Sequence, residues 1–283
     1  MNRRRQGAWP APDVAVASPS PREFARLSEL LREHAGLAFD PGKSSLIESR
    51  VRRRLRALGL ADYGAYLRVL DSGDGARELV QLIDVVATGV TRFFREPDHF
   101  AFAAAAARRL ASGGRRLHFW SAGCATGEEP YSLAMVLRAD LPASADWRIL
   151  ATDISTLALQ RAQRGNYTPA QVAAVPRRFQ ATSFAAGAGP DGDILRVVDD
   201  LKQRVLFRRL NLGRVPFPIR GDFDVVFCRN VLIYFDPRQR ADALAEFHRL
   251  LRPGGHLIVG PSETLLGVED RFERRQPAVY RRV

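Results

Sequence analysis

The sequence predicts an α/β protein in which a small all-helical N-terminal domain precedes a doubly wound sheet with a small antiparallel β-subdomain inserted in it. Three observations support this fold class. Residues 21–90 show only the helical spacing of apolar side chains. From about Thr91 to the end, short apolar runs alternate with helical patterns, as in a parallel α/β sheet. The alternation weakens between about residues 167 and 212, where turn residues are dense.

Composition sets limits on this prediction. The 283 residues, of which 46% are hydrophobic, suffice for one large and one small domain. No apolar run approaches the roughly 20 residues that a membrane-spanning helix needs, and the segment MNRRRQGAWPAPD lacks an apolar signal core. We therefore expect no membrane insertion and a cytoplasmic location. Two cysteines without CxxC spacing and five scattered histidines predict no metal site.

The N-terminal part divides into a tail and a helical domain. Residues 1–20 are rich in Pro, Ala, Ser and Arg without a period, which predicts a disordered tail. The next segment, PREFARLSELLREHAGL, places Phe24, Leu27, Leu30 and Leu31 at a helical spacing that ends near Gly36. We expect a basic helical domain over residues 21–90.

A second predicted helix, SSLIESRVRRRLRALGL, combines an apolar stripe with a dense run of arginines. Five arginines and no acid occur within residues 50–56, and we expect them to face outward. Such a run can simply be solvated, but its density and the net charge of +12 favour an anionic partner. Arg50, Arg53 and Arg54 are the candidate substrate-facing residues. The expected stripe, which ends before the stop signal Gly59, consists of Ile47, Val51, Leu55 and Leu58.

The second half of the chain predicts the sheet. Apolar runs indicate strands at residues 117–123, 147–153, 223–228, 255–260 and 278–283, with helices at 130–139, 155–165 and 238–255, the last stopped by Pro253 and Gly254. The turn-rich segment 187–193 separates Phe184 from the β-rich segments 194–198 and 204–210, which predicts an antiparallel insertion. The alternative is a long irregular loop.

Glycines and carboxylates follow the first predicted strand. The spacing Gly123-x-x-x-Gly127 is followed at once by Glu128 and Glu129, which would repel a pyrophosphate but attract an ammonium or sulfonium group. Asp153, after the next strand, is suited to accept ribose hydroxyls. A ribose-bearing, positively charged ligand without phosphate is S-adenosylmethionine. The alternative is ordinary β–turn–α packing.

Two further side chains are candidates for the chemistry. Arg95 lies in the segment ATGVTRFFREPDHF, and Tyr234 follows Arg229 and Asn230 after the third predicted strand. An arginine and a tyrosine that converge on a methyl donor can bind and orient a carboxylate. As alternatives, Arg95 pairs with a neighbouring acid such as Glu96 or Asp98, and Tyr234 is a core aromatic.

These motifs occur together in one known family. The segments VRRRLRALGL, TRFFREPDHF, WSAGCATGEEPYSLA, ATDIS, FCRNVLIYF and LRPGGHLIVGPSE stand in the order seen in the chemotaxis protein methyltransferases (CheR), which the chain resembles over residues 21–283. The resemblance implies a Rossmann-like class I methyltransferase domain at residues 91–283. It also implies methyl transfer from S-adenosylmethionine to glutamate side chains on cytoplasmic helices of methyl-accepting chemoreceptors, with methyl esters as products.

The resemblance further implies a set of site residues. Arg95 and Tyr234 are nearest the chemistry. Gly89 replaces an asparagine found two residues before the motif threonine in members similar to the enteric enzymes. In some members the β-subdomain binds a receptor tail peptide, and the sequence leaves this open here. Together with the glycines Gly89, Gly123 and Gly127, the expected cofactor-binding residues are Thr91, Arg95, Glu128, Asp153, Asn211, Leu212, Arg229 and Asn230.

Two other functions fit part of this pattern. A methyltransferase of another acceptor, such as RNA, would also use a basic surface, but the helical segment lacks the interleaved aromatics of a base-stacking platform. We therefore expect no nucleic-acid partner. A non-catalytic S-adenosylmethionine-sensing module is the second alternative, against which the presence of Arg95, Glu128, Asp153 and Tyr234 argues.

Overall fold

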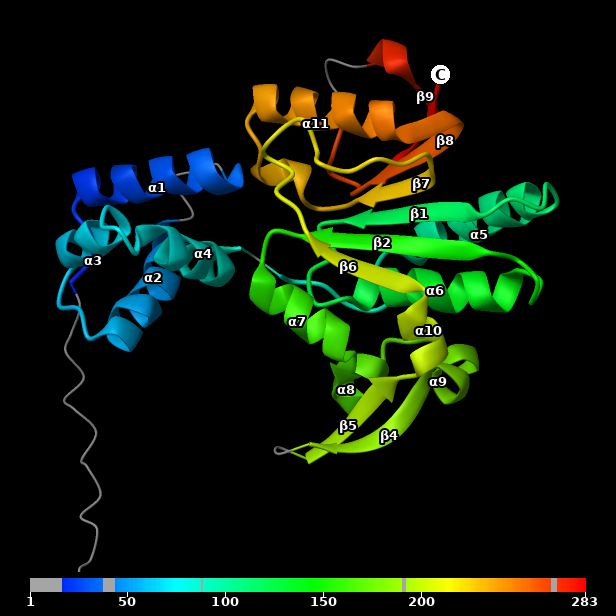
Figure 1. Ribbon diagram of the computed structural model, residues 1–283, viewed down its shortest axis with the longest axis horizontal. Coiled ribbons are helices and arrows are strands. Elements are labelled where there is room, and N and C mark those ends of the chain that lie inside the picture. The colour runs from blue at the N-terminus through cyan, green and yellow to red at the C-terminus, as the bar shows by residue number, and fades with distance from the viewer. Residues whose placement is uncertain (1–16, 38–43, 88, 190–191, 266–268) are drawn as a thin grey trace, which may run out of the picture.

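The computed structural model describes residues 17–37, 44–87, 89–189, 192–265 and 269–283 (Figure 1). Of the tail expected at residues 1–20, residues 1–16 lie outside the described residues. Residues 17–20 have no regular structure, and Ser20 forms a capping box with Glu23 at the start of the first helix.

Four helices form the N-terminal part. They are α1 (Pro21–Ala35), α2 (Ser44–Leu58), α3 (Tyr63–Leu70) and α4 (Gly75–Val86). Helix α1 ends at Ala35 and is capped by Gly36, whose φ of 71° suits glycine. The predicted apolar stripe of α2 is buried at Ile47, Val51 and Leu55, but Leu58 at the end of the helix is 38% exposed, so its expected place in the core is wrong.

The arginines of α2 do not all face outward, and the prediction is wrong for two of them. The Arg54 guanidinium donates to both carboxylate oxygens of Glu78 on α4, at 2.7 and 2.6 Å, and Tyr66 donates to the same carboxylate at 2.8 Å. Arg50 donates to the carbonyl of Val86 at 2.9 Å, at the C-terminal end of α4. Both side chains hold α2 against α4, since a buried carboxylate and helix-end carbonyls each need a donor.

The main sheet has seven strands in the order β6-β2-β1-β7-β8-β10-β9. The first five run parallel, and β10 pairs antiparallel with both β8 and β9, so the sheet is mixed. From β1 the chain proceeds to β2 and β6 on one side, and it then returns to β7 on the other side of β1 and continues to β8. The strand order therefore reverses between β1 and β7, which makes this position a topological switch point. The strands are β1 (Leu117–Ala122), β2 (Trp147–Asp153), β6 (Val205–Arg209), β7 (Phe223–Cys228), β8 (Leu251–Val259), β9 (Phe272–Gln276) and β10 (Val279–Arg282).

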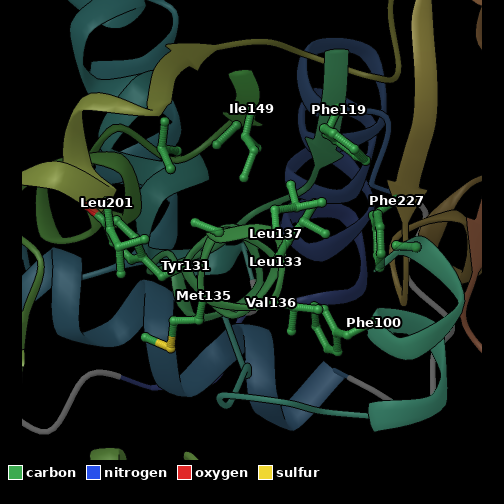
Figure 2. Close-up of a cluster of buried hydrophobic side chains, with 14 of the residues drawn as sticks. Phe100, Phe119, Tyr131, Leu133, Met135, Val136, Leu137, Ile149, Leu201 and Phe227 are labelled. Carbon is green, nitrogen blue, oxygen red and sulfur yellow. The ribbon is translucent and has the colours of Figure 1, made fainter. Parts of the chain in front are cut away.

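Helices cover both faces of the sheet, which confirms the doubly wound prediction (Figure 1). Helices α5 (Pro97–Ala111), α6 (Glu128–Asp140) and α7 (Thr156–Arg164) lie on one face, and α11 (Pro237–Leu250) lies on the other. One hydrophobic core lies between the sheet and helices α5, α6 and α7, and a second lies between the sheet and α11. Figure 2 shows the first of these, where Leu133 and Leu137 of α6 lie next to Phe119 and Ile149 of the central strands. Because successive strand residues alternate between the two cores, most residues of the central strands are apolar.

The predicted antiparallel insertion is present but smaller than expected. It consists of β3 (Asn166–Tyr167), β5 (Gly192–Val197) and β4 (Phe184–Gly189), paired in that order. The segment 204–210, assigned to the insertion from sequence, instead forms β6, which pairs in parallel with β2 in the main sheet. Short helices α8 (Pro169–Val172), α9 (Arg177–Ser183) and α10 (Asp199–Gln203) connect these strands.

Near the C-terminus the element boundaries differ from the prediction. Helix α11 ends at Leu250, and Pro253 and Gly254 lie within β8 rather than at the helix end. Strand β9, which was not predicted, follows the short 3-10 helix η3 (Glu269–Arg271) and pairs with β10. None of the described helices has the length and apolar character needed to span a bilayer.

The helical and sheet-containing parts meet through specific hydrogen bonds. The buried Asp84 of α4 accepts from the backbone N–H of Thr156 at 2.6 Å and from its hydroxyl at 2.5 Å, at the first residue of α7. On α1, the carbonyl of His34 accepts from the side-chain amide of Asn211 at 2.8 Å. A Cβ on Gly36 would lie 2.8 Å from the Cα of Gly213, so this approach requires glycine.

Replacing Asp84 with alanine tests the first contact. The change leaves the partly buried N–H and hydroxyl of Thr156 without their acceptor, so we expect Asp84→Ala to lower the free energy of unfolding by about 2 kcal/mol. Chemical denaturation measures this value. Asp242→Ala, an exposed position on α11, is the control and should shift stability by less than about 0.5 kcal/mol. Equal stability of the two variants would contradict the assignment.

Candidate functional site

A cleft lies at the carboxyl ends of β2, β1 and β7, where open α/β sheets bind their ligands. Leu37 and Ala35, from the end of α1, form part of its wall, so both parts of the chain contribute. The expected site residues that line this cleft are Thr91, Arg95, Gly123, Asp153, Asn211, Leu212, Arg229, Asn230 and Tyr234.

Asp153 is held at the end of β2 by backbone donors. One carboxylate oxygen accepts from the N–H of Ala125 at 2.8 Å, and the other accepts from the N–H of Ser155 at 2.9 Å. Each carboxylate oxygen has a second acceptor position. The carboxylate is thus fixed in orientation and can still accept hydrogen bonds from a ligand in the cleft.

The loop after β1 needs its two glycines for different reasons. Gly123 has a φ of 84°, and a Cβ there would lie 2.4 Å from the Val231 side chain. Gly127 has a φ of 99°, and a Cβ there would lie 2.9 Å from the Tyr167 hydroxyl. Gly123 lines the cleft, whereas Gly127 packs against α7 and β3. The glycines therefore allow close packing around the cleft rather than forming a phosphate cradle.

The two adjacent glutamates lie in different environments. Glu129 lines the cleft, where it accepts from the Ser121 hydroxyl at 2.6 Å. Glu128 is not among the cleft-lining residues: its buried carboxylate accepts from the Thr126 hydroxyl at 2.6 Å and from Gln171 of α8 at 3.4 Å. Glu129, which the site prediction omitted, therefore carries the negative charge that faces the cleft on this helix.

Arg229 connects three elements at the cleft. Its side chain is 2% exposed and pairs with Glu129 at 3.1 Å and with Glu96 at 2.6 Å. It also donates to the backbone carbonyl of Arg95. The single guanidinium thus joins the end of β7 to α6 and to the turn before α5, as its fork of five donors permits.

Arg95 itself is carried by a turn with unusual backbone. Phe94 and Glu96, on either side, have φ values of 52° and 57°, which non-glycine residues rarely adopt. The N–H of Phe94 donates to the Ser132 hydroxyl at 3.0 Å, and the Phe94 ring stacks on Phe179 of α9 at 5.3 Å. Arg95 also lies 3.5 Å from the Glu96 carboxylate, which is the alternative pairing raised from the sequence.

Gly89 and two of the three candidate substrate-facing arginines, Arg50 and Arg53 but not Arg54, line a second hollow beside the cleft. This hollow, which we term the α2–α7 groove, shares Ala87 and Asp153 with the cleft. Arg53 on α2 and Arg161 on α7, both exposed, lie at its rim. The further residues that line it are Arg50, Asp84, Val85, Gly89, Thr126, Ser155, Leu157 and Ala158.

Comparison with known proteins identifies the family. The family model for the CheR methyltransferase all-alpha domain matches residues 22–87, and the model for the CheR methyltransferase SAM binding domain matches residues 89–280. The chain belongs to the CheR methyltransferase family. It is accordingly an S-adenosylmethionine-dependent methyltransferase.

Relatives of this CheR chain extend over nearly its whole length. The chemotaxis protein methyltransferase of Escherichia coli (strain K12) is 39% identical, with 92% of this chain and 91% of that protein covered. The protein of the same name from Salmonella typhimurium is 37% identical, with 92% and 90% covered. That of Borreliella burgdorferi is 34% identical, with 92% and 94% covered.

The residues of this CheR cleft fit S-adenosylmethionine chemically. Asp153 and Glu129 offer carboxylate acceptors to hydroxyl and cationic groups, while Arg92 and Arg95 offer cations to a carboxylate. Within the described residues, no group of His, Cys, Asp and Glu side chains is arranged for a metal ion. The sequence signals for the missed residues were present, because Glu96 and Glu129 stand inside the quoted motifs, but their orientation was not predictable from spacing.

Burial gives the cleft carboxylates a pH signature. Desolvation raises the pKa of Asp153 and of Glu129 above the ordinary range, in spite of the backbone and Arg229 donors that oppose it. Ligand binding that uses the ionised carboxylates should therefore weaken as pH falls through these raised pKa values, at higher pH than for an exposed acid. For the unliganded fold the sign is opposite, because a folded-state pKa above the unfolded one means that protonation favours folding.

S-adenosylhomocysteine is the product that the cofactor becomes when its methyl group is lost. We expect its dissociation constant to rise as pH is lowered from 8 to 5. Asp153→Asn should bind S-adenosylhomocysteine more weakly, and its affinity should depend less on pH. Isothermal titration calorimetry at fixed ionic strength measures both. Asp222→Asn, an exposed position outside the cleft, should leave the profile unchanged. An affinity that is constant over this pH range in the parent protein would contradict a role for the ionised carboxylates.

Proposed function

We propose that this protein transfers the methyl group of S-adenosylmethionine to glutamate side chains of methyl-accepting chemoreceptors, in the cytoplasm, for chemosensory adaptation. One observation carries the proposal. In a chain of the CheR family, one cleft is lined by the carboxylates of Asp153 and Glu129 and also by Arg95 and Tyr234. The names of its relatives, chemotaxis protein methyltransferases, support the same acceptor class.

The cofactor would be held by acidic, amide and basic side chains that line the cleft. Asp153 is the acceptor for ribose hydroxyls, and Asn230 and the backbone around Leu212 are further polar contacts. Glu129 places negative charge near a cationic group of the cofactor, and Arg92 binds the cofactor's carboxylate. When bound, S-adenosylmethionine supplies a methyl group attached to a positively charged sulfur.

The chain's own contribution to the reaction is positioning rather than proton transfer. A glutamate with a pKa near 4.3 is almost wholly ionised at pH 7, so the acceptor needs no general base. Arg95 and Tyr234 bind and orient this carboxylate through a charge-assisted and a neutral hydrogen bond. Alignment of two reactants contributes about 7 to 11 kcal/mol in favourable cases, which makes geometry the main catalytic term.

The receptor would approach along the α2–α7 groove. Receptor helices near a methylation site present glutamates, and Arg53 and Arg161 give the groove rim a positive charge. Arg50 and Arg54 support this surface indirectly, because they hold α2 on α4 through the contacts with Val86 and Glu78. Two shared lining residues lead from the groove to the cleft.

The β-subdomain is the candidate binding site for a receptor tail peptide. Strand β4 is at the edge of its three-stranded sheet, so its outer backbone groups can pair with an added strand. Ala185 and Ala186 on β4 are exposed and small, which leaves that edge open to a peptide backbone. Binding of receptor tail peptides to the parent protein, measured by calorimetry, tests this part of the proposal.

The decisive experiment identifies the acceptor. The protein is incubated with methyl-labelled S-adenosylmethionine and membranes that carry chemoreceptors from the same cell, and the products are treated with alkali. Volatile labelled methanol from receptor-sized bands is the expected result, because carboxyl methyl esters are base-labile. Base-stable label or label in RNA would indicate another acceptor, and cofactor binding without transfer would indicate a sensing module.

Arg95→Ala tests the orienting role. We expect turnover at saturating cofactor to fall by about 100-fold, since one charged contact to the acceptor is lost, while the affinity for S-adenosylhomocysteine falls much less. Arg109→Ala, an exposed arginine at the end of α5, is the control and should keep full turnover. Normal turnover of Arg95→Ala would remove Arg95 from the mechanism.

Reversing charge at the groove rim tests receptor docking. We expect Arg53→Glu combined with Arg161→Glu to lower kcat/KM for receptor by about tenfold at low salt and by less at high salt, since the lost attraction is screened. S-adenosylhomocysteine affinity should stay unchanged. Arg164→Glu with Arg274→Glu makes the same charge change at exposed positions outside the groove, and equal losses in the two double variants would show only an effect of net charge.

A further inference from the structure

Glu263 forms an unusual set of contacts behind the cleft. The residue is 5% exposed, and its carboxylate accepts from the backbone N–H groups of Asn230 at 2.8 Å, Val231 at 2.9 Å and Leu232 at 2.8 Å. A fourth backbone N–H, that of Gly260, donates to it at 2.5 Å. Three of these four donors are consecutive residues, and the carboxylate therefore organises a whole segment rather than one contact.

The segment that Glu263 binds has a backbone conformation that non-glycine residues rarely adopt. Asn230 has a φ of 59°, and Val231 follows with a φ of −116° and a ψ of −46°. Successive left- and right-handed residues turn their N–H groups to one side and form a concave anion site. The Glu263 side chain fills this concavity, so its charge offsets the strain at Asn230.

This segment forms one wall of the cofactor cleft. Asn230 and Val231 line the cleft directly, and the 3-10 helix η2 (Leu232–Tyr234), which carries Tyr234, starts at the residue held by Glu263. Gly260 is part of the same arrangement: a Cβ there would lie 2.7 Å from the Glu263 carboxylate and 2.8 Å from the Asn230 amide. The segment is thus fixed from behind, with its other side toward the cleft.

We propose that Glu263 is a positioning residue for the methyltransferase reaction, which sets the shape of the Asn230–Tyr234 wall and so places Asn230 for the cofactor and Tyr234 for the acceptor. Glu263 does not line the cleft, so its effect passes through the backbone that it binds. The inference rests on the proposed assignment of this cleft to cofactor and acceptor.

The test replaces Glu263 with glutamine, which keeps the size of the side chain but turns an amide NH₂ toward backbone donors. We expect Glu263→Gln to weaken S-adenosylhomocysteine binding at least tenfold by calorimetry. We also expect kcat at saturating cofactor to fall at least tenfold and the KM for receptor to stay within twofold. Hydrogen exchange of the amides of residues 230–232 should accelerate in the same variant.

Glu246→Gln is the matched control. The Glu246 carboxylate also accepts from a loop backbone N–H, that of Phe217 at 2.7 Å, and pairs with Arg249 on α11, outside the cleft. A purely structural role of Glu263 would make the two variants alike, with lower stability and unchanged affinity. A folded Glu263→Gln protein with parental affinity and kcat would overturn the proposal.

Two further variants keep the test decisive if Glu263→Gln does not fold. Glu263→Asp keeps the charge and shortens its reach, and Gly260→Ala crowds the carboxylate and Asn230 without removing the charge. Both should weaken S-adenosylhomocysteine binding more than Glu246→Gln does, and parental affinity in both would overturn the proposal. Because cofactor binding needs no receptor, a Glu263 effect on affinity stands even if the acceptor proves to be something other than a chemoreceptor.

Discussion

The cleft depends on the buried guanidinium of Arg229. A cation that is 2% exposed is stable only when its charge is compensated, and here the carboxylates of Glu96 and Glu129 and the carbonyl of Arg95 provide the compensation. Because Glu129 belongs to α6 and Glu96 and Arg95 belong to the turn before α5, the requirement for charge balance fixes both elements relative to the end of β7. The ring of Phe100 lies 5.4 Å from the guanidinium and excludes water from one side. The place of Arg95 in the cleft is therefore a consequence of an ion network that lies beneath it.

Carboxylates at the strand ends perform a second task besides binding ligands. Ala125 and Asn230, with φ values of 47° and 59°, are both non-glycine residues in the left-handed region, and each donates its N–H to a buried acid. Asp153 holds the first and Glu263 holds the second, so the strain of about 1 to 3 kcal/mol per residue is offset by charge-assisted hydrogen bonds. Asp153 lines the cleft and Glu263 does not. Both carboxylates thus stabilise a left-handed residue, but Asp153 does so at a position that faces the cleft, whereas Glu263 does so behind the wall, where its charge acts only on the backbone.

The sequence predicts those features whose signal is local. The central strands were predictable because burial on both faces makes most of their residues apolar. The segment that forms β6 was assigned to the insertion because it is a β-rich run after the turn-rich segment 187–193, and only its pairing with β2 places it in the main sheet. Glu128 and Glu129 are chemically identical, but about 100° of helical rotation separates them, so one faces the cleft and the other Thr126. The pairing of Arg54 with Glu78, which is 24 residues away, carries no local signal.

The basic surface of α2 does not include Arg54, because its guanidinium faces Glu78. The net charge of +12 does not act as a uniform field, because Arg54 is neutralised by Glu78 inside the helical domain. The groove rim has Arg53 from one part of the chain and Arg161 from the other. A surface assembled from two parts exists only while they stay docked, which the contact between Asp84 and Thr156 favours.

The groove and the cofactor cleft also share a wall. A ligand that shifts this wall changes the affinity of the other site, and linkage requires any such effect on binding to be equal in both directions. The geometry therefore favours an enzyme in which the proposed acceptor docking and cofactor binding are coupled through Ala87 and Asp153, which line both hollows.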